Sequence, residues 1–419
     1  MILLALAGAV AAVAWTSPIP PISPPEPASF DRPTIARGEA LSHLGNCRGC
    51  HTAPRGEPFA GGRGLPTPFG TVFVTNITPD RETGIGAWSR QAFTRAMRQG
   101  IARNGELLYP AFPYDHFTRA SDDDLAALYA FLMTRPAIKA TAPANRLRRP
   151  VNWRRVMAVW NLAFLRSGPL AEDPGQTAVW NRGRALAEGL AHCGACHTPR
   201  NEWGAERADA AYDGAWTEGW YAPPLNARSP ALRPWTEDEL FAYLSTGLSA
   251  QHASAAGPMN EVAHELARAA PEDVRAIAAY FASLIAKAPA HRGERPLPDK
   301  PAASASNPEG AVLFAGACSA CHAPGAPMLQ QGRPALALGT SLNLDSPHDV
   351  LHVIVQGLPA PPGRSAERMP AFGEILSDSQ LAEIAGYLRA RFTDRPPWPN
   401  LPQAVREVRS QQGGLKDGS

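Results

Sequence analysis

Three short stretches stand out in this sequence, and each repeats the same pattern: Cys47-Arg-Gly-Cys50-His51, Cys193-Gly-Ala-Cys196-His197 and Cys318-Ser-Ala-Cys321-His322. Together they contain all six cysteines of the chain, so none is left over for a disulfide framework. In each stretch about one helical turn separates two thiols, and a histidine follows the second thiol directly. The question for function is therefore which metal or cofactor two thiols and an adjacent imidazole can bind.

This spacing is typical of covalent haem c attachment, in which the cysteines bond the haem vinyl groups and the histidine reaches the iron. A zinc site needs four ligands in one place, but each stretch supplies three and the next lies more than a hundred residues away. A thioredoxin-like redox pair would not require the histidine three times. The sequence therefore predicts three covalently bound haem c groups, with proximal iron ligands His51, His197 and His322.

A proline follows each of these histidines closely, and a backbone carbonyl there could accept a hydrogen bond from the histidine Nδ1–H. The three prolines are Pro54, Pro199 and Pro324. An ordinary loop proline is an equally good interpretation, because this chain contains 43 prolines.

The passages downstream of the motifs share a second pattern, a helix that closes at a glycine. The three glycines are Gly100, Gly247 and Gly357, and twelve positions after them stand Phe112, Met259 and Met369. A thioether is a soft, neutral ligand that suits haem iron. A buried methionine more often fills a gap in a core, but the shared position favours Met259 and Met369 as distal iron ligands.

Phenylalanine cannot bind iron, so the first haem needs another explanation. His116 lies in the same loop and offers an imidazole, and we predict it as the distal ligand of this haem. Met97, Met133 and an open, five-coordinate iron are the alternatives. Both methionines stand at helical spacing among apolar neighbours, which fits a core position better.

The repeats also predict the fold, which is all-α with three tandem class I cytochrome c domains. A glycine precedes each first cysteine by eight to ten residues, at Gly38, Gly183 and Gly310, and each repeat ends in a helix at residues 122–133, 271–284 and 378–392. The predicted domains are residues 32–140, 176–295 and 308–395, with a helical connector at 141–175, a Pro-rich linker at 296–307 and a C-terminal tail at 396–419. Within the connector, the apolar residues 151–168 favour packing between domains over a membrane or quinone contact.

Residues 1–31 read as a leader followed by a proline-rich linker. The apolar run at 1–15 has the length of a signal peptide and falls short of the roughly 20 residues of a spanning helix. No Lys or Arg precedes this run, so an uncleaved N-terminal anchor is the alternative. Both interpretations export the rest of the chain. The formal net charge of +2 indicates no nucleic-acid partner.

The ordered motifs of the first repeat resemble those of triple-haem cytochrome c subunits of membrane-associated bacterial dehydrogenases, which serve alcohols, aldehydes and gluconate. After the first haem motif these are Asn76-Ile-Thr-Pro-Asp80, Thr83-Gly-Ile-Gly-Ala-Trp88, Tyr109-Pro-Ala-Phe-Pro-Tyr114 and Asp122-Asp-Asp-Leu125. In that family the third motif often carries methionine as the axial ligand, and this chain departs from it at Phe112. The Phe-Pro-Tyr-Asp-His-Phe version is most similar to the branch that accompanies molybdenum hydroxylases.

The resemblance implies an electron-transfer subunit without catalytic residues of its own. Its partners would be a catalytic dehydrogenase subunit and, as acceptor, ubiquinone or a terminal oxidase, at the periplasmic surface of the cytoplasmic membrane. The sequence shows no P-loop, no dinucleotide-binding fingerprint and no nucleophile elbow. The alternative, which Phe112 keeps open, is a peroxidase-like haem enzyme with an open distal site at the first haem. A cytochrome-like sensor or scaffold is a third hypothesis.

Overall fold

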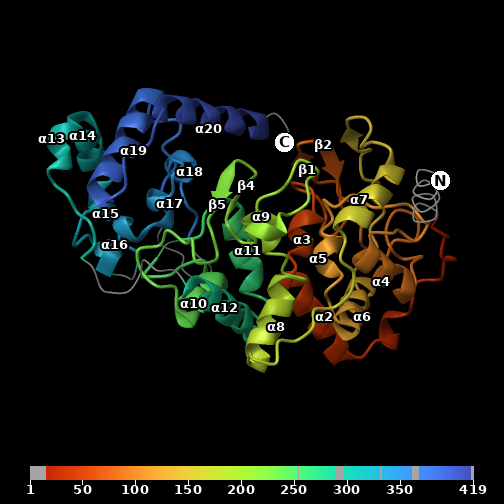
Figure 1. The fold of residues 1–419 in the computed structure, drawn as a ribbon. Coiled ribbons are helices and arrows are strands. Elements are labelled where there is room, and N and C mark those ends of the chain that lie inside the picture. Colours follow the sequence, from red (N-terminus) through yellow and green to blue (C-terminus); the bar gives the residue numbers. More distant parts are fainter. Residues whose placement is uncertain (1–15, 253, 288–295, 331–332, 361–367, 417–419) are drawn as a thin grey trace, which may run out of the picture. The chain divides into compact units, whose positions relative to one another are not determined.

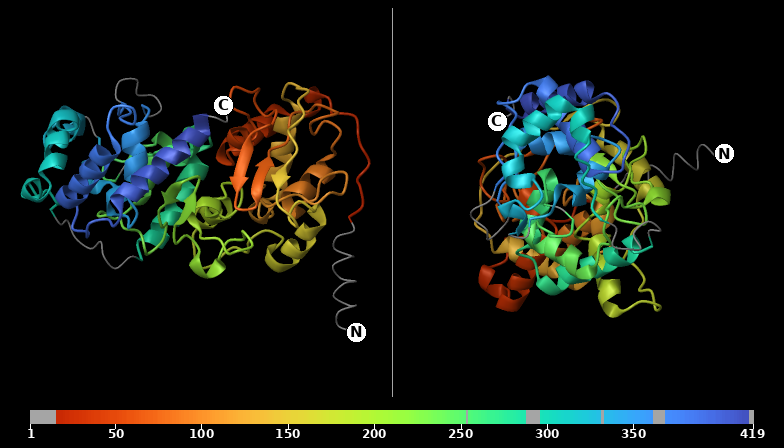
Figure 2. Two further views of the ribbon diagram at one scale, coloured as in Figure 1. Left: turned by 90° about the horizontal axis from the view of Figure 1, so that it is seen from above. Right: turned by 90° about the vertical axis from the view of Figure 1, so that its left-hand side faces the viewer.

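The structure is a computed structural model that describes residues 16–252, 254–287, 296–330, 333–360 and 368–416. The described chain is mainly helical, with two small sheets (Figures 1 and 2). The predicted leader, residues 1–15, lies outside the described residues. The chain divides into two compact units, and the division runs through the predicted second domain. The three-domain organisation therefore stays a prediction.

The first unit comprises residues 1–195, 200–206 and 268–277. Its elements are η1 (Pro27–Ser29), α2 (Arg32–Leu44), α3 (Cys47–Cys50), β1 (Gly64–Thr67), β2 (Gly70–Phe73), α4 (Arg90–Gln99), α5 (Tyr114–Phe117), α6 (Asp122–Met133), β3 (Arg146–Leu147), η2 (Arg154–Val156), α7 (Met157–Phe164) and α8 (Ala178–Ala187). Two helices, α9 (Gly194–His197) and α12 (Pro271–Ile285), have residues in both units.

The second unit comprises residues 196–199, 207–267 and 278–419. Its elements are η3 (Ala208–Ala210), β4 (Ala215–Thr217), β5 (Trp220–Ala222), α10 (Glu237–Thr246), α11 (Gly257–Leu266), α13 (Ala303–Ser306), α14 (Pro308–Ala317), α15 (Ser319–His322), α16 (Pro327–Gln330), η4 (Leu336–Leu338), α17 (Thr340–Asn343), α18 (His348–Gln356), α19 (Asp378–Phe392) and α20 (Leu401–Lys416).

Serine and glycine residues cap the helix ends. Ser121 accepts a hydrogen bond from the backbone N–H of Asp124 (3.0 Å) at the start of α6, and Ser377 forms a capping box at the start of α19. Gly100 and Gly247 end α4 and α10 in the left-handed conformation, which glycine adopts without steric cost. The predicted helices after the haem motifs are thereby confirmed.

The helix that leads into each motif crosses the last helix of its repeat, as the pairs α2 with α6, α8 with α12, and α14 with α19 show (Figure 1). A glycine stands at each crossing. A Cβ added to Gly38 would lie 2.0 Å from the carbonyl oxygen of Ala127, and one on Gly183 would lie 1.9 Å from that of Ala276. Backbones this close leave no room for a side chain, which explains the repeated glycine that the sequence shows before each motif.

We expect Gly310→Ala to lower the free energy of unfolding by about 1–3 kcal/mol, because the new methyl group would overpack the crossing of α14 with α19. A Cβ at Gly310 would lie 2.6 Å from both the carbonyl oxygen of Glu383 and the Cβ of Tyr387. Gly316→Ala in the same helix is the control, since an added Cβ there meets no atom within 4 Å. Urea titration of both variants is the measurement, and equal effects would contradict the prediction.

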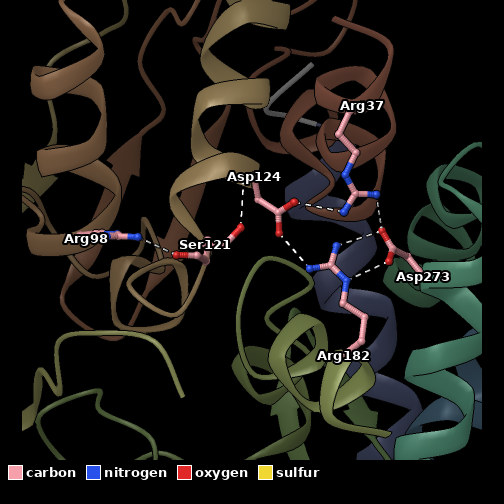
Figure 3. Close-up of polar contacts among 7 residues, drawn as sticks. Arg37, Arg98, Ser121, Asp124, Arg182 and Asp273 are labelled. Carbon is pink, nitrogen blue, oxygen red and sulfur yellow. Dashed lines mark hydrogen bonds and ion pairs between the residues drawn. The ribbon is translucent and has the colours of Figure 1, made fainter. Parts of the chain in front are cut away.

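A ring of four charges joins two of these crossings within the first unit (Figure 3). Arg37 of α2 lies 3.0 Å from Asp124 of α6 and 2.8 Å from Asp273 of α12, and Arg182 of α8 lies 2.9 and 3.0 Å from the same two carboxylates. The aspartate side chains are only 9% and 6% exposed. Each arginine directly precedes a crossing glycine. The ring therefore ties the helices of the first repeat to those of the second.

The charge ring predicts a loss of stability in acid. Burial would raise the pKa of Asp124, but Arg182 and Arg37 outweigh burial and lower it. A carboxyl group with a lowered folded-state pKa stabilises the fold above its unfolded pKa of about 3.9, and this contribution is lost as the pH falls through the folded-state pKa. We expect Asp124→Asn to be destabilised by about 1–3 kcal/mol at pH 7, and the difference from wild type to vanish in acid.

Urea titrations of both proteins across pH 2–7 measure this difference. Glu82→Gln is the control, because the Glu82–Lys139 pair is 69% and 71% exposed and should contribute little. A difference between wild type and Asp124→Asn that stayed constant down to the lowest pH would show that the ionised carboxylate is not the cause.

The two small sheets are a feature that the all-α prediction missed. Strands β1, β2 and β3 form one antiparallel sheet, and β4 and β5 form the other. The β4–β5 turn consists of Glu218 and Gly219, both with positive φ, as a tight two-residue hairpin turn requires. These strands have two to four residues each, too few for a readable alternation of apolar and polar positions.

Two segments predicted as a linker and a tail are packed. The proline-rich stretch after residue 15 is hydrogen-bonded along the first unit, from Ile19 N–H to the Arg103 carbonyl (2.8 Å) and from Ile22 N–H to the Ala87 carbonyl (3.1 Å). The predicted C-terminal tail contains α20, which buries Ala404, Val405 and Val408 in the core of the second unit. The predicted linker at 296–307 also carries a short helix, α13.

The predicted apolar connector, residues 151–168, contains η2 and α7. Met157, Ala158 and Trp160 are buried, in agreement with the expected packing role. Among the described residues no single helix has the length and apolar character to span a membrane. One pair of helical segments, Pro308–Ala317 with Ser319–Leu329, has the length and composition of a span when taken together, but the two are bent by 78° relative to each other.

Candidate haem attachment sites

Each Cys-x-x-Cys-His motif forms one short helical turn, namely α3, α9 or α15. Asn46 and His192, each directly before the first cysteine of its motif, have φ of 47° and 39°. This left-handed residue turns the chain sharply from the preceding helix into the motif. None of the six cysteines is in a disulfide. Cys47 and Cys50 both belong to α3, whereas Cys193 and Cys318 stand directly before α9 and α15. The spacing of about one turn is the one that covalent attachment to one haem requires.

Two proximal histidines are oriented by a backbone carbonyl. Nδ1 of His51 lies 2.7 Å from the carbonyl oxygen of Thr75, and Nδ1 of His197 lies 2.7 Å from that of Pro223. Both carbonyls come just after a hairpin, β1–β2 in one case and β4–β5 in the other. With Nδ1–H donating to the carbonyl, the lone pair of Nε2 is left for iron.

For His51 and His197 this finding favours the interpretation of the following proline as an ordinary loop proline, because the acceptor carbonyl lies elsewhere. The acceptors stand 24 and 26 residues beyond their histidines, where no local sequence pattern marks them. Nδ1 of His322 is buried and has no hydrogen-bond partner in the part of the chain that the structure describes.

Desolvation favours the neutral form of all three proximal imidazoles. Burial lowers the pKa of His51 to about 4 and lowers the pKa of His197 and of His322, although the carbonyl hydrogen bonds of the first two oppose the shift. A neutral imidazole is the form that binds iron. Across the described residues, no three His, Cys, Asp or Glu side chains gather into a group that could hold a metal ion by themselves. Two thiols and one neutral imidazole per motif fit haem c.

The distal loops are alike in the first two repeats and different in the third. After Gly100 the chain turns back at the Ile101–Leu107 bridge, and after Gly247 it turns back at the Leu248–Ser254 bridge. Phe112 and Met259 each stand five positions beyond these bridges, so they have the same offset from the bridge in their loops.

Met369 occupies a different place in its loop, because it is itself the bridge partner of Leu358. Twelve residues after the helix-ending glycine, the chain has therefore passed the bridge in the first two repeats but is still at the bridge in the third. Met369 packs against the core of the second unit, and Met259 lies in the first turn of α11.

Comparison with known proteins agrees with this arrangement. Residues 305–388 match the family model described as Cytochrome C oxidase, cbb3-type, subunit III. The chain is 45% identical to one of the subunits of nicotinate dehydrogenase from Pseudomonas putida over 96% of its own length, and it spans 34% of that protein. It is 36% identical to the fructose dehydrogenase cytochrome subunit of Gluconobacter japonicus, covering 92% of this chain and 85% of the relative.

A third relative, the gluconate 2-dehydrogenase cytochrome c subunit of Pantoea cypripedii, is 37% identical over 85% of each chain. The chain belongs to the cytochrome c subunits of dehydrogenase complexes. The cytochrome is accordingly an electron-transfer component rather than a catalytic subunit, and it carries covalently bound haem c.

His116 of this cytochrome is engaged by other groups than iron. Its Nδ1 lies 2.9 Å from the carbonyl oxygen of Glu188, and its Nε2 lies 2.6 Å from the carboxylate of Glu206. Burial would lower the pKa of His116, but Glu206 outweighs burial and raises it. An imidazole that donates from both nitrogens has no lone pair for iron. The structure therefore argues against the prediction of His116 as a distal ligand.

Sequence reasoning could not find this ion pair, since Glu206 lies 90 residues from His116 along the chain. The pair rests against the second motif, because a Cβ on Gly194 would lie 2.7 Å from the Glu206 carboxylate and 3.1 Å from the His116 ring. His116 thus ties the distal loop of the first repeat to the attachment turn of the second.

We expect His116→Ala to leave the low-spin electron paramagnetic resonance signals of the haems unchanged. Stability should fall by about 1–3 kcal/mol, because the half-buried Glu206 loses its partner. Spectra of the ferric protein, with unfolding followed in parallel, measure both effects. Conversion of one low-spin haem to high spin would restore His116 as a ligand.

Proposed function

We propose that this cytochrome carries three haem c groups and passes electrons from a separate catalytic dehydrogenase subunit to ubiquinone or a terminal oxidase, at the periplasmic surface of the cytoplasmic membrane. The observation that carries the proposal is the threefold recurrence of one unit: a helix crossing at a glycine, then two thiols about one helical turn apart, then a half-buried histidine whose pKa is lowered. Three cytochrome c domains at residues 32–140, 176–295 and 308–395 account for this recurrence.

We infer that the catalytic partner resembles nicotinate dehydrogenase. We also infer that it is a molybdenum hydroxylase, because the loop of the first repeat resembles the branch that accompanies those enzymes. Two observations favour it over the alcohol, fructose and gluconate types. The nicotinate relative is 45% identical to this chain, against 32–37% for the others named here. The loop from Tyr109 to Phe117 also carries phenylalanine at its centre, as in that branch. Co-purification of the native complex, followed by a molybdenum assay, tests this inference.

The haem count tests the main proposal. Pyridine haemochrome analysis of the purified chain should give three haems per polypeptide, and replacing both cysteines of one motif with serine should give two. A count of one or two in the unaltered chain would overturn the proposal.

Met259 and Met369 are the distal ligands that we propose for the second and third haems. Met259→Ala with Met369→Ala should abolish the near-infrared sulfur-to-iron charge-transfer band of the ferric protein, and each single change should remove about half of it. Met97→Leu is the control, because this buried methionine (6% exposed) lies in the core of the first unit. Full intensity in the double variant would exclude both residues.

A second candidate function rests on Phe112 and on the engagement of His116. Together they leave the first haem without a distal ligand from its own loop. An open haem can react with peroxide, and in its ferrous form it binds carbon monoxide. Carbon monoxide binding to one haem of the reduced protein would favour this peroxidase-like activity. Complete resistance to carbon monoxide would exclude an open site.

A further inference from the structure

The connector between the first two repeats concentrates positive charge. Residues 125–171 contain no Asp or Glu and eight Lys or Arg, whereas the whole chain has 40 basic and 38 acidic residues. Lys139 pairs with Glu82 and Arg154 lies 3.8 Å from Glu106. Arg148, Arg155 and Arg166 are exposed to solvent. This part of the first unit therefore presents positive charge that its own acids do not neutralise.

Apolar side chains are exposed at the same place. Trp153 is 63% exposed, and Val159 and Leu162 on the outer side of α7 are 51% exposed each. Arg155 comes just before this helix and Arg166 just after it. We call these five residues the connector face. An apolar centre with a tryptophan, flanked by arginines, is the composition of segments that lie in the headgroup region of a membrane.

The opposite side of α7 is covered by the first repeat and by residues 203–205 of the second. Met157 and Ala158 pack with Leu107 and Tyr109 in one cluster, and Trp160 packs with Tyr114 in another. Packing within the chain thus explains the inner apolar side of the helix and leaves the outer side without an explanation. Because Phe112 belongs to the second cluster, the distal loop of the first haem lies directly beneath the connector face.

The N-terminal segment reaches the same region independently. Thr16, the first described residue, donates from its hydroxyl to the carbonyl of Gly105, and Ile19 N–H donates to that of Arg103 (2.8 Å). Arg154, at the start of the connector helices, donates to the carbonyl of Leu107 (3.1 Å). The first described residue therefore lies against the turn 103–107, to which Arg154 of the connector is also hydrogen-bonded.

We propose that the connector face binds an anionic phospholipid surface, with Trp153, Val159 and Leu162 at headgroup depth and the arginines on the phosphates. Charge complementarity supports a negatively charged partner. The exposed tryptophan beside arginines favours the headgroup region of a membrane over an acidic protein. The inference rests on the proposed membrane location, and it adds the surface of contact and the orientation of the first haem toward the lipid.

The test is flotation of the purified haem-loaded cytochrome with vesicles of phosphatidylglycerol and phosphatidylethanolamine, compared with vesicles of phosphatidylcholine. The wild type should float with the anionic vesicles. Arg155→Glu with Arg166→Glu should weaken this binding tenfold or more, since each basic residue near such a surface contributes about 1 kcal/mol. Val159→Ser with Leu162→Ser should weaken it as well.

The matched control is Val312→Ser with Ile375→Ser, two apolar residues of the second unit that are 72% and 70% exposed. This variant should bind like the wild type, and all variants should keep three haems and the wild-type spectrum. Unchanged binding by both connector variants would overturn the proposal. The proposal would also be overturned if both connector variants kept vesicle binding but lost the co-purifying catalytic subunit. The connector face would then be a protein interface. Neither result would alter the haem count or the ligand assignments on which the proposed function rests.

Discussion

The close crossing of two helices is the constraint on which the rest of this structure depends. The backbones touch at Gly38, Gly183 and Gly310, where no side chain fits. The crossing fixes the end of the first helix, and the motif follows within ten residues. Two thiols and a histidine are thus delivered to the same place in each repeat. The crossing depends on contacts between distant parts of the chain, yet its requirement for glycine is visible in the sequence.

Around this common frame the repeats differ in what surrounds the haem. Short hairpins place a carbonyl behind His51 and His197, so these ligands are oriented by the backbone and cannot be altered by a side-chain substitution. The charge ring links the first two crossings, whereas the third repeat has Glu309 in the position of the ring arginines. The charge ring therefore links the first two repeats to each other, and the third repeat lacks the arginine that such a link requires.

The loop that carries Phe112 is fixed by contacts on two sides. Its aromatic residues pack beneath α7, and its histidine is held by Glu206 next to the second motif. A loop fixed on both sides has little freedom to supply a ligand. This arrangement distinguishes the first repeat from the other two, which carry a methionine at the same count, and it places the loop beside the attachment turn of the second repeat.

The sequence by itself determined the haem motifs, the repeated helices with their serine and glycine caps, and the family, because these depend on residues a few positions apart. The hairpin strands, the packing of α20 and the partners of His116 came only from the tertiary structure. The hairpin strands are too short to show an alternating pattern in the sequence. The carbonyl partner of His51 and the carboxylate partner of His116 lie 24 and 90 residues away along the chain. Counting from the preceding glycine made Met369 equivalent to Met259. The bridge in the third repeat closes a longer loop, so the two methionines lie at different points of their loops.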